Sequence, residues 1–242
     1  MRFRERGCLA VLFAQLVLTM AASSLWTGDL YAADLSDAVS PDPPTLVEAL
    51  RGEHILEMSG GFARTLILTG KGVARRAVPG SQEALPVDEL SGLDGMLAQV
   101  AFGSKHMAAL THSGQVYTLG SGNEGQLGHG NTTSSQVFTL VDTAHFEGAR
   151  IVMAACGSAH SVAATAEGDV FTWGAGRFGC LGHNDEQRRL APAKLGRWQF
   201  GGGKVVLVAA GLAHTVALAE GGVLWVWGHG DMSLGCQMLS AS

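Results

Sequence analysis

Charged residues are scarce in this sequence, and neither sign is in large excess. Asp, Glu, Lys and Arg make up 15% of the 242 residues, against about 25% in an average soluble domain. Lys and Arg number 16 and Asp and Glu number 21, which gives a net charge of −5. A nucleic-acid-binding domain usually has a basic face and an isoelectric point above about 9. We therefore expect no nucleic-acid partner.

The sequence also lacks the short motifs that carry common catalytic and metal chemistry. It contains no G-x-S-x-G, no G-x-x-x-x-G-K-[ST], no H-E-x-x-H and no C-x-x-C, which argues against hydrolase, phosphate-loop and zinc sites. The stretch Gly120–Gly125 matches G-x-G-x-x-G, but it recurs at Gly174–Gly179 between expected strands. A dinucleotide site needs a helix after that motif. We expect no cofactor, no metal and no enzymatic activity.

The first residues have the order of a secretory signal peptide. Arg2, Arg4 and Arg6 precede an apolar run over Cys8–Ala22, and small residues follow at 21–24. This order predicts a signal peptide at residues 1–23 and a secretory or extracellular location. A retained membrane anchor and a mis-started segment are the alternatives, and without an anchor we expect no stable membrane insertion. Asn131-Thr132-Thr133 is a glycosylation sequon, which has meaning only in the secretory pathway.

An acidic stretch follows. Residues 29–57 hold seven acids and one base, Arg51; the acids are Asp29, Asp34, Asp37, Asp42, Glu48, Glu53 and Glu57. A run of one charge sign is typical of a solvated segment. We predict an acidic linker at residues 24–54.

The strongest signal is an internal repeat. Residues 97–130, 151–184 and 205–235 align at an offset of 54. Residues shared at equivalent positions are Gly103, Gly157 and Gly211; His106, His160 and His214; Gly120, Gly174 and Gly228; and Trp173 and Trp227. Similarity at a fixed period indicates a repeat architecture. The boundaries that follow are a degenerate copy at 55–96, repeats at 97–150 and 151–204, and a truncated repeat at 205–242.

Each copy reads as a set of short strands. Runs at 98–102, 106–111, 115–119 and 136–141 are separated by Gly and Ser turns. Four strands in about 50 residues predict one blade of a β-propeller. The fold class is therefore all-β, a partial propeller of three to four antiparallel four-stranded blades. We expect the small second strand to lie near the axis, residues 73–88 to be irregular, and the last copy to lack its fourth strand.

The motifs resemble a known family. Gly211–Ala217 fits G-x-x-H-[ST]-x-A, while Phe171–Gly176 and Gly125–Gly128 fit the second half, G-x-V-[YF]-x-W-G-x-G-x-x-G-Q-L-G. This pattern resembles the regulator-of-chromosome-condensation repeat, which implies a seven-bladed propeller. Residues 55–242 provide only about 3.5 units of 54 residues. We expect a fragment of a longer array, and the alternatives are a ring completed by a second chain and an open arc.

Three functions are compatible with such an array. We favour a non-catalytic protein-interaction scaffold. The resemblance implies, as the alternative, nucleotide exchange on a small GTPase, with a cytoplasmic or nuclear location. Light sensing by some family members relies on Gly-Trp-Arg-His motifs that Trp173, Trp198, Trp225 and Trp227 do not share. A ubiquitin-ligase role would need a catalytic domain that this sequence does not include.

The candidate binding residues are those that differ between copies. The loop after Leu-Gly in the third copy carries both charge signs, at Asp185, Glu186, Arg188 and Arg189. Variation between repeats usually falls on loops of one face, often the binding face. We predict that these four residues contact a protein partner, with a simple solvated turn as the alternative. The repeated histidines are expected to hold the blades by bonding to backbone.

Overall fold

The computed structural model describes residues 31–32, 45–46, 50–61, 64–71, 74–77, 84–86, 93, 96–229 and 237–239. The predicted signal peptide and most of the predicted linker lie outside these residues. Within the linker, β1 (Tyr31–Ala32) and β2 (Thr45–Leu46) form a small antiparallel pair. In the part of the chain so described, no helix is long and apolar enough to span a membrane.

Four antiparallel sheets of four strands form the rest of the fold, and each sheet is one blade. Blade 1 contains β3 (Ile55–Gly61), β4 (Arg64–Thr69), β5 (Ala74–Ala77) and β6 (Ala84–Pro86). Blade 2 contains β7 (Leu97–Phe102), β8 (His106–Thr111), β9 (Val116–Gly120) and β10 (Ser135–Leu140). Blade 3 contains β11 (Ile151–Cys156), β12 (His160–Thr165), β13 (Val170–Gly174) and β14 (Arg189–Lys194). Blade 4 contains β15 (Val205–Ala210), β16 (His214–Ala219), β17 (Leu224–Gly228) and β18 (Gln237–Leu239).

The partial propeller is confirmed, and so is the equivalence of its repeats. His106, His160 and His214 each pair across the sheet with the glycine that ends the third strand: Gly120, Gly174 and Gly228. Two expectations about strands were wrong. Residues 73–88 were expected to be irregular, but β5 and β6 complete blade 1. The last copy was expected to lack its fourth strand, but β18 pairs with β17. All three strands are short and lack the repeated motif, so periodicity could not reveal them.

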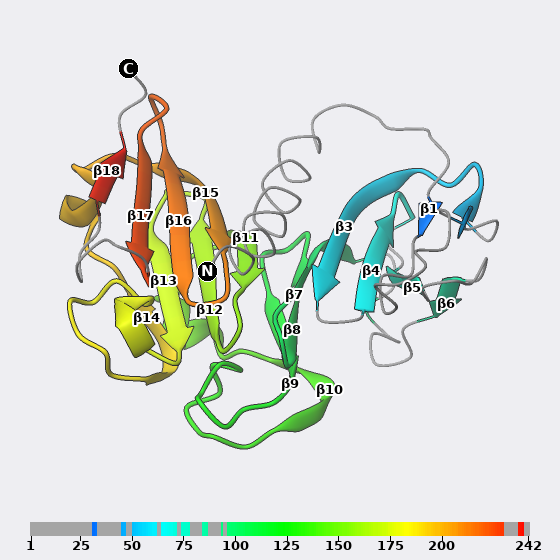
Figure 1. The fold of residues 1–242 in the computed structure, drawn as a ribbon, viewed down its shortest axis with the longest axis horizontal. Coiled ribbons are helices and arrows are strands. Elements are labelled where there is room, and N and C mark those ends of the chain that lie inside the picture. Colours follow the sequence, from blue (N-terminus) through cyan, green and yellow to red (C-terminus); the bar gives the residue numbers. More distant parts are fainter. Residues whose placement is uncertain are drawn as a thin grey trace, which may run out of the picture.

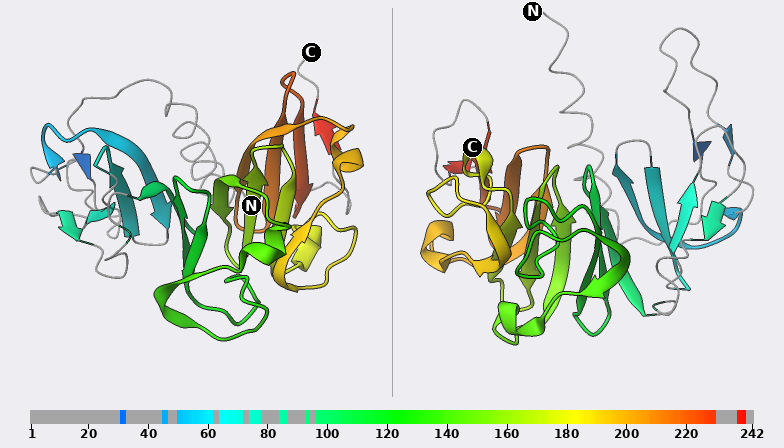
Figure 2. Two further views of the ribbon diagram at one scale, coloured as in Figure 1. Left: turned by 180° about the vertical axis from the view of Figure 1, so that it is seen from behind. Right: turned by 90° about the horizontal axis from the view of Figure 1, so that it is seen from below.

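The blades stand side by side in an arc (Figures 1 and 2). The first strand of each blade contacts the first strand of the next, from β3 through β7 and β11 to β15. The innermost strand is therefore the first one. The second strand lies beside it and also contacts the first strand of the next blade, as β8 does with β11 and β12 with β15, so the expectation that it lies near the axis is confirmed. Its alanines are small because they are buried between adjacent blades.

Aromatic side chains fill the space between blades. After the outer strand of blade 2, the 3-10 helix η3 (Thr143–Phe146) places Phe146 edge-on against Phe171 and Trp173 of blade 3, with ring centroids 5.4 and 5.8 Å apart. The helix η5 (Arg197–Phe200) repeats this arrangement, with Phe200 5.8 Å from Trp227. The segments that connect blade 2 to blade 3 and blade 3 to blade 4 thus each place a phenylalanine ring against the aromatic side chains of the following blade. Such aromatic contacts add to the stability that comes from burial.

Trp173 and Trp198 form a matched pair for testing this core. Trp173 is fully buried, whereas Trp198 on η5 is 74% exposed. We expect Trp173→Ala to lower the free energy of unfolding by about 3–5 kcal/mol, because it removes a large buried side chain and leaves a cavity. Trp198→Ala should change it by less than about 0.5 kcal/mol. Urea unfolding followed by circular dichroism measures both, and equal effects would contradict this account of the core.

Candidate functional site

One end of the blades carries the loops that were predicted to bind. Because the strands are antiparallel, the connections from first to second strand and from third to fourth strand lie at the same end of every blade. We call this end the loop face; it comprises residues 103–105, 121–134, 157–159, 175–188, 211–213 and 229. Loops tolerate variation that packed strands do not. The loop face is therefore the candidate functional site.

The predicted binding residues of blade 3 divide into two pairs. Asp185 accepts a hydrogen bond from the Gln187 backbone N–H at 2.9 Å and forms an ion pair with Arg189 at 2.9 Å. Arg189 also begins β14, so this pair shapes the loop. Glu186 and Arg188 are exposed. The structure thus brings Asp185 and Arg189 together and leaves Glu186 and Arg188 facing solvent, where contact with a partner stays a prediction.

The same loop carries an aromatic residue that the sequence analysis missed. Phe178, in η4 (Arg177–Gly179), is 48% exposed and has a left-handed backbone with φ of +59°. Its ring stands edge-on to His229 of blade 4 at 4.5 Å, and the preceding Arg177 pairs with Glu124 of blade 2 at 3.0 Å. A left-handed conformation is uncommon outside glycine and often marks functional sites. In the sequence, the sign of this exposed ring is a difference between copies: Phe178 stands where the preceding repeat has Glu124.

A hydrogen-bond relay beneath this face joins blades 2, 3 and 4. His106 Nε2 lies 2.9 Å from Ser161 Oγ of the next blade, and His160 Nε2 lies 3.0 Å from Thr215 Oγ1. Each hydroxyl in turn donates to a loop carbonyl of the preceding blade: Ser161 to Gln126 and Thr215 to Cys180. The expectation that the histidines bond to backbone is incomplete: His160 has a backbone partner at His214, but His106 and His160 also bond a hydroxyl of the next blade. The ring bonds a hydroxyl, which explains why Ser or Thr follows the histidine in the motif.

The relay determines the protonation of each histidine. The single O–H of Ser161 donates its hydrogen bond to the Gln126 carbonyl, so the Ser161 oxygen must accept a hydrogen bond from an N–H at His106 Nε2. His106 is therefore the neutral tautomer protonated at Nε2, and its buried Nδ1 has no hydrogen-bond partner among the residues that the structure describes. Burial is the main cause that lowers the pKa of His106 to about 3 and the pKa of His160 to about 4. The ring of His106 lies directly over Gly103, where a Cβ atom would come within 2.6 Å of Nδ1.

The interface between blades 1 and 2 has no such relay. Arg64 stands at the histidine position and Met107 at the hydroxyl position. Both partners of the relay are thus replaced at the same interface. Met107 instead packs against the apolar cluster that includes Leu68, Leu97 and Val100.

The third strands carry a second repeated contact. Thr118 donates to the Leu127 carbonyl at 2.7 Å and lies 3.0 Å from His129 Nε2. Thr172 repeats both contacts with Leu181 and His183, at 2.7 and 3.1 Å. His129 and His183 lie in the loops, as expected, but each ring also anchors its loop to the strand below. Partial burial is the main cause that lowers the pKa of His183 to about 4.

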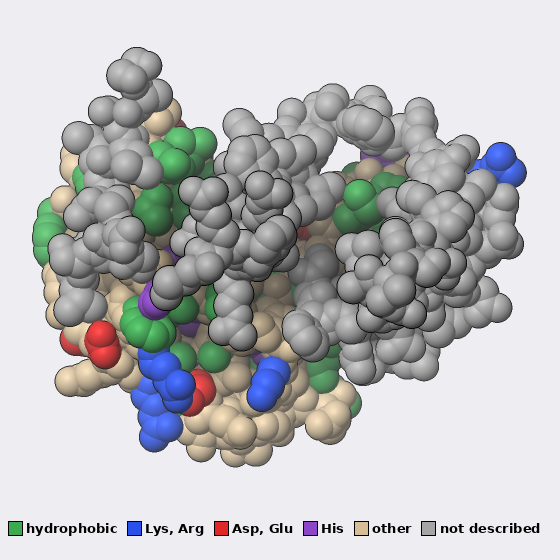
Figure 3. Space-filling model, in the orientation of Figure 1, with side chains coloured by type: hydrophobic (Ala, Val, Ile, Leu, Met, Phe, Trp, Pro, Cys, Tyr) green, Lys and Arg blue, Asp and Glu red, His purple; other side chains and the backbone are tan. Residues whose placement is uncertain are grey.

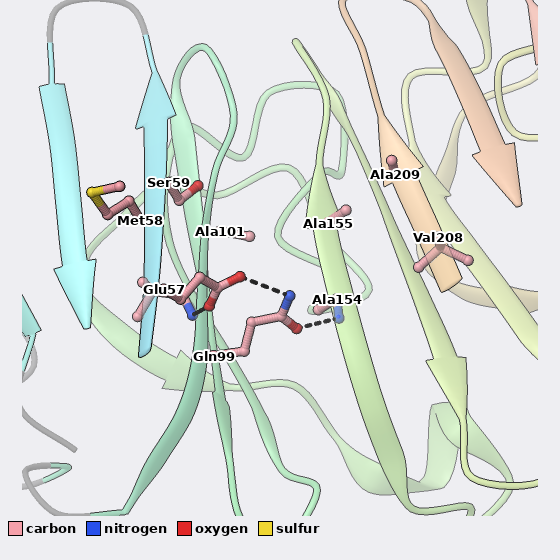
Figure 4. Close-up of a pocket in the computed structure, with 10 residues that line it drawn as sticks. Glu57, Met58, Ser59, Gln99, Ala101, Ala154, Ala155, Val208 and Ala209 are labelled. Atoms are coloured by element: carbon pink, nitrogen blue, oxygen red, sulfur yellow. Dashed lines mark hydrogen bonds between the residues drawn. The ribbon is translucent and has the colours of Figure 1, made fainter. Parts of the chain in front are cut away.

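At the axis, side chains cover the free edges of the inner strands. The Glu57 carboxylate accepts the Val100 N–H at 2.9 Å, Gln99 Oε1 accepts the Ala154 N–H at 2.8 Å, and Met153 Sδ lies 3.2 Å from Val208 N. Each acceptor follows a bulge in its own strand. Figure 4 shows Glu57 and Gln99 at a small pocket between the inner strands. Burial raises the pKa of Glu57 to about 7, although both hydrogen bonds to the carboxylate lower it.

The described residues contain no cluster of three His, Cys, Asp or Glu side chains that could hold a metal ion. Cys156 and Cys180 are free and buried, and burial raises the pKa of each thiol to about 12. A thiol of such high pKa is protonated at neutral pH and is a poor nucleophile.

His160→Ala and Thr215→Val test the relay directly. Each leaves a buried polar partner without its hydrogen bond, and we expect each to lower the free energy of unfolding by roughly 1–3 kcal/mol. Because both remove the same contact, the double variant should lose less than the sum, with a coupling of about 0.5–3 kcal/mol. Denaturant unfolding measures the free energy of unfolding of the unaltered chain, the two single variants and the double variant. His112→Ala, on the exposed side chain of a turn, is the control, and strict additivity would show that the relay carries no energy.

The same histidines set the pH dependence of stability. The pKa values of His106 and His160 fall from 6.5 to about 3 and about 4 on folding, so their contribution is complete above pH 6.5 and is lost as pH falls toward 4. The pKa of Glu57 rises from 4.5 to about 7, so its contribution is complete below pH 4.5 and is lost as pH rises through 7. The pKa of His183 also falls on folding, to about 4, so three histidines oppose one carboxyl, and stability should fall by roughly 2 kcal/mol per pH unit between pH 6.5 and 4.5.

Glu57→Gln should steepen that fall, because it removes the opposing group. Urea unfolding at several pH values measures both slopes. Stability that rises on acidification of the unaltered chain would contradict the neutral histidines.

Known proteins resemble this chain in sequence. Models of the regulator of chromosome condensation (RCC1) repeat match residues 113–164 and 167–218, and a second model of this repeat matches 97–126 and 153–180. The ultraviolet-B receptor UVR8 of Arabidopsis thaliana is 33% identical over 217 residues, which cover 81% of this chain and 48% of the receptor. The chain thus spans about half the length of this relative.

Solved structures agree on the fold. Human WBSCR16 superposes with a TM-score of 0.66 at 24% identity, over 83% of this chain and 56% of that one. Prp20p of Saccharomyces cerevisiae superposes with a TM-score of 0.65 at 19% identity, over 84% of this chain and 54% of that one. The repeated glycines and histidines, the relay between blades and these matches agree, and the chain belongs to the RCC1 repeat family.

Proposed function

We propose that the chain is a non-catalytic protein-interaction scaffold and that its loop face holds the partner. One observation carries the proposal: blade 3 presents Phe178 and Arg188 to solvent from a loop that is held on both sides. Arg177 ties this loop to blade 2 through Glu124, and the Phe178 ring ties it to blade 4 through His229. Exposed groups on a rigid support lose little freedom on binding, which favours affinity.

The chemistry of these residues supports a protein partner. Aromatic and arginine side chains dominate the energetics of protein interfaces, and Phe178 and Arg188 lie in one loop. Figure 3 shows Lys and Arg side chains gathered beside hydrophobic and histidine side chains on the face that it draws. Of the predicted binding residues, we assign direct contact to Glu186 and Arg188. Asp185 and Arg189 are assigned the shaping of the loop.

Nucleotide exchange on a small GTPase is the alternative. The study of Prp20p describes its binding to Gsp1p and histones, and that structure resembles this chain in fold at 19% identity. A shared fold does not by itself transfer an activity. The two functions differ in one measurable respect, because only exchange accelerates nucleotide release.

The experiment compares three immobilised forms of the full chain: unaltered, Arg188→Glu and Trp198→Ala. Arg188→Glu reverses a charge on the loop face, whereas Trp198→Ala removes an exposed ring on η5, which follows an outer strand at the opposite end of the blades. Proteins captured from cell extract are quantified by mass spectrometry. We expect Arg188→Glu to reduce capture of the specific partner at least tenfold and Trp198→Ala to leave it unchanged, with both variants within about 0.5 kcal/mol of the original stability.

Equal capture by all three forms would place the binding site elsewhere. Each captured GTPase is then loaded with a fluorescent guanine nucleotide and mixed with the soluble chain. Accelerated release would replace the scaffold proposal with nucleotide exchange.

A further inference from the structure

The loop of blade 2 displays an asparagine in an open turn. Residues 130–134 are all exposed, and the Thr133 backbone N–H donates to Asn131 Oδ1 at 2.8 Å. Asn131 Nδ2 makes one long contact, 3.3 Å to the His129 carbonyl. A Cβ atom added at the neighbouring Gly130 would meet nothing within 4 Å. The amide nitrogen therefore stands at the edge of free space.

The equivalent turn of blade 3 shows which atoms the fold needs here. Asp185 lies 54 residues after Asn131, and its Oδ1 accepts the Gln187 backbone N–H at 2.9 Å. Blade 3 thus makes the same turn without an amide nitrogen at the first position and without a hydroxyl at the third. In blade 2 the turn uses the Asn131 oxygen and the Thr133 backbone, and the Thr133 hydroxyl has no hydrogen-bond partner among the described residues.

The turn itself needs neither the Asn131 amide nitrogen nor the Thr133 hydroxyl, and these are the two groups that define a glycosylation sequon. Asn131-Thr132-Thr133 is the one N-x-[ST] sequence in the chain. We propose that Asn131 is an N-glycosylation site and that residues 1–23 deliver the chain to the secretory pathway, where this modification takes place. The proposal goes beyond the scaffold function and is compatible with it, whereas a secretory location is incompatible with exchange on a cytoplasmic or nuclear GTPase.

The transfer is balanced with one co-reactant, a lipid-diphosphate-linked oligosaccharide. Asn131 Nδ2 forms a bond to the anomeric carbon of the sugar, and the bond from that carbon to the diphosphate oxygen breaks. The lipid diphosphate leaves with the bonding electrons, and the amide loses one proton to the transferase. The turn survives, because its hydrogen bond uses Oδ1.

The experiment expresses the full chain with a C-terminal tag in eukaryotic cells and treats the product with peptide N-glycosidase. The unaltered chain should lose one discrete mass step on treatment and acquire aspartate at position 131, which peptide mass spectrometry locates. Asn131→Asp keeps the turn oxygen, as Asp185 does, and should abolish the step. Thr133→Ala should abolish it as well, whereas the control Thr132→Ala should keep it.

A gain-of-site variant uses the equivalent turn of blade 3. Asp185→Asn combined with Gln187→Thr creates Asn-x-Thr there and should add a second step. A further arm replaces residues 1–23 with an established secretory leader. An unaltered chain that shows no step overturns the proposal, and so does a step that appears only with the replaced leader. A step that persists in Asn131→Asp also overturns it.

Discussion

The hydrogen-bond relay between blades is the interaction on which the rest of the structure depends. A histidine ring, a hydroxyl of the next blade and a loop carbonyl form one chain of donors and acceptors, and the relay repeats between blades 2 and 3 and between blades 3 and 4. These groups are buried, and buried polar groups are costly unless they are satisfied. The relay therefore permits one register between neighbouring blades, and apolar packing alone would be less selective. It also attaches the loop face to the core, since the accepting carbonyls belong to loop residues.

This attachment explains how the loops can differ without disturbing the blades. Loops of blades 2 and 3 contribute a carbonyl, at Gln126 and Cys180, whose role is independent of the side chain. Gln126 uses its side chain to hold the Glu124 N–H at 2.9 Å, whereas Cys180 points its thiol to the Ala175 carbonyl at 3.1 Å. The loop of blade 3 then adopts the left-handed turn that presents Phe178. Variation in function is thereby confined to side chains that the relay does not use.

Much of the fold could be predicted from the sequence, because three copies align without interruption over their first three strands. The repeated glycines and histidines predicted where those strands lie and where the turns between them fall. The prediction was wrong where the repeat signal fades: β5, β6 and β18 are three or four residues long and share no motif with the other copies. The candidate site was predicted in part. Arg188 and Glu186 are exposed as expected, but the pairing of Asp185 with Arg189 depends on a turn that composition does not reveal.

The sequence by itself determined the repeat, its period and the residues that every blade shares, because equivalent positions meet equivalent surroundings and so keep similar side chains. Tertiary structure alone decided which atoms meet across blades. The acceptors at the axis are a carboxylate, an amide and a thioether, at Glu57, Gln99 and Met153, which occupy the same position of the repeat but differ in chemistry. Each follows a bulge, where its side chain reaches the free edge of the next inner strand. Such a role belongs to the geometry of adjacent blades, and it can be recognised only when the blades are assembled.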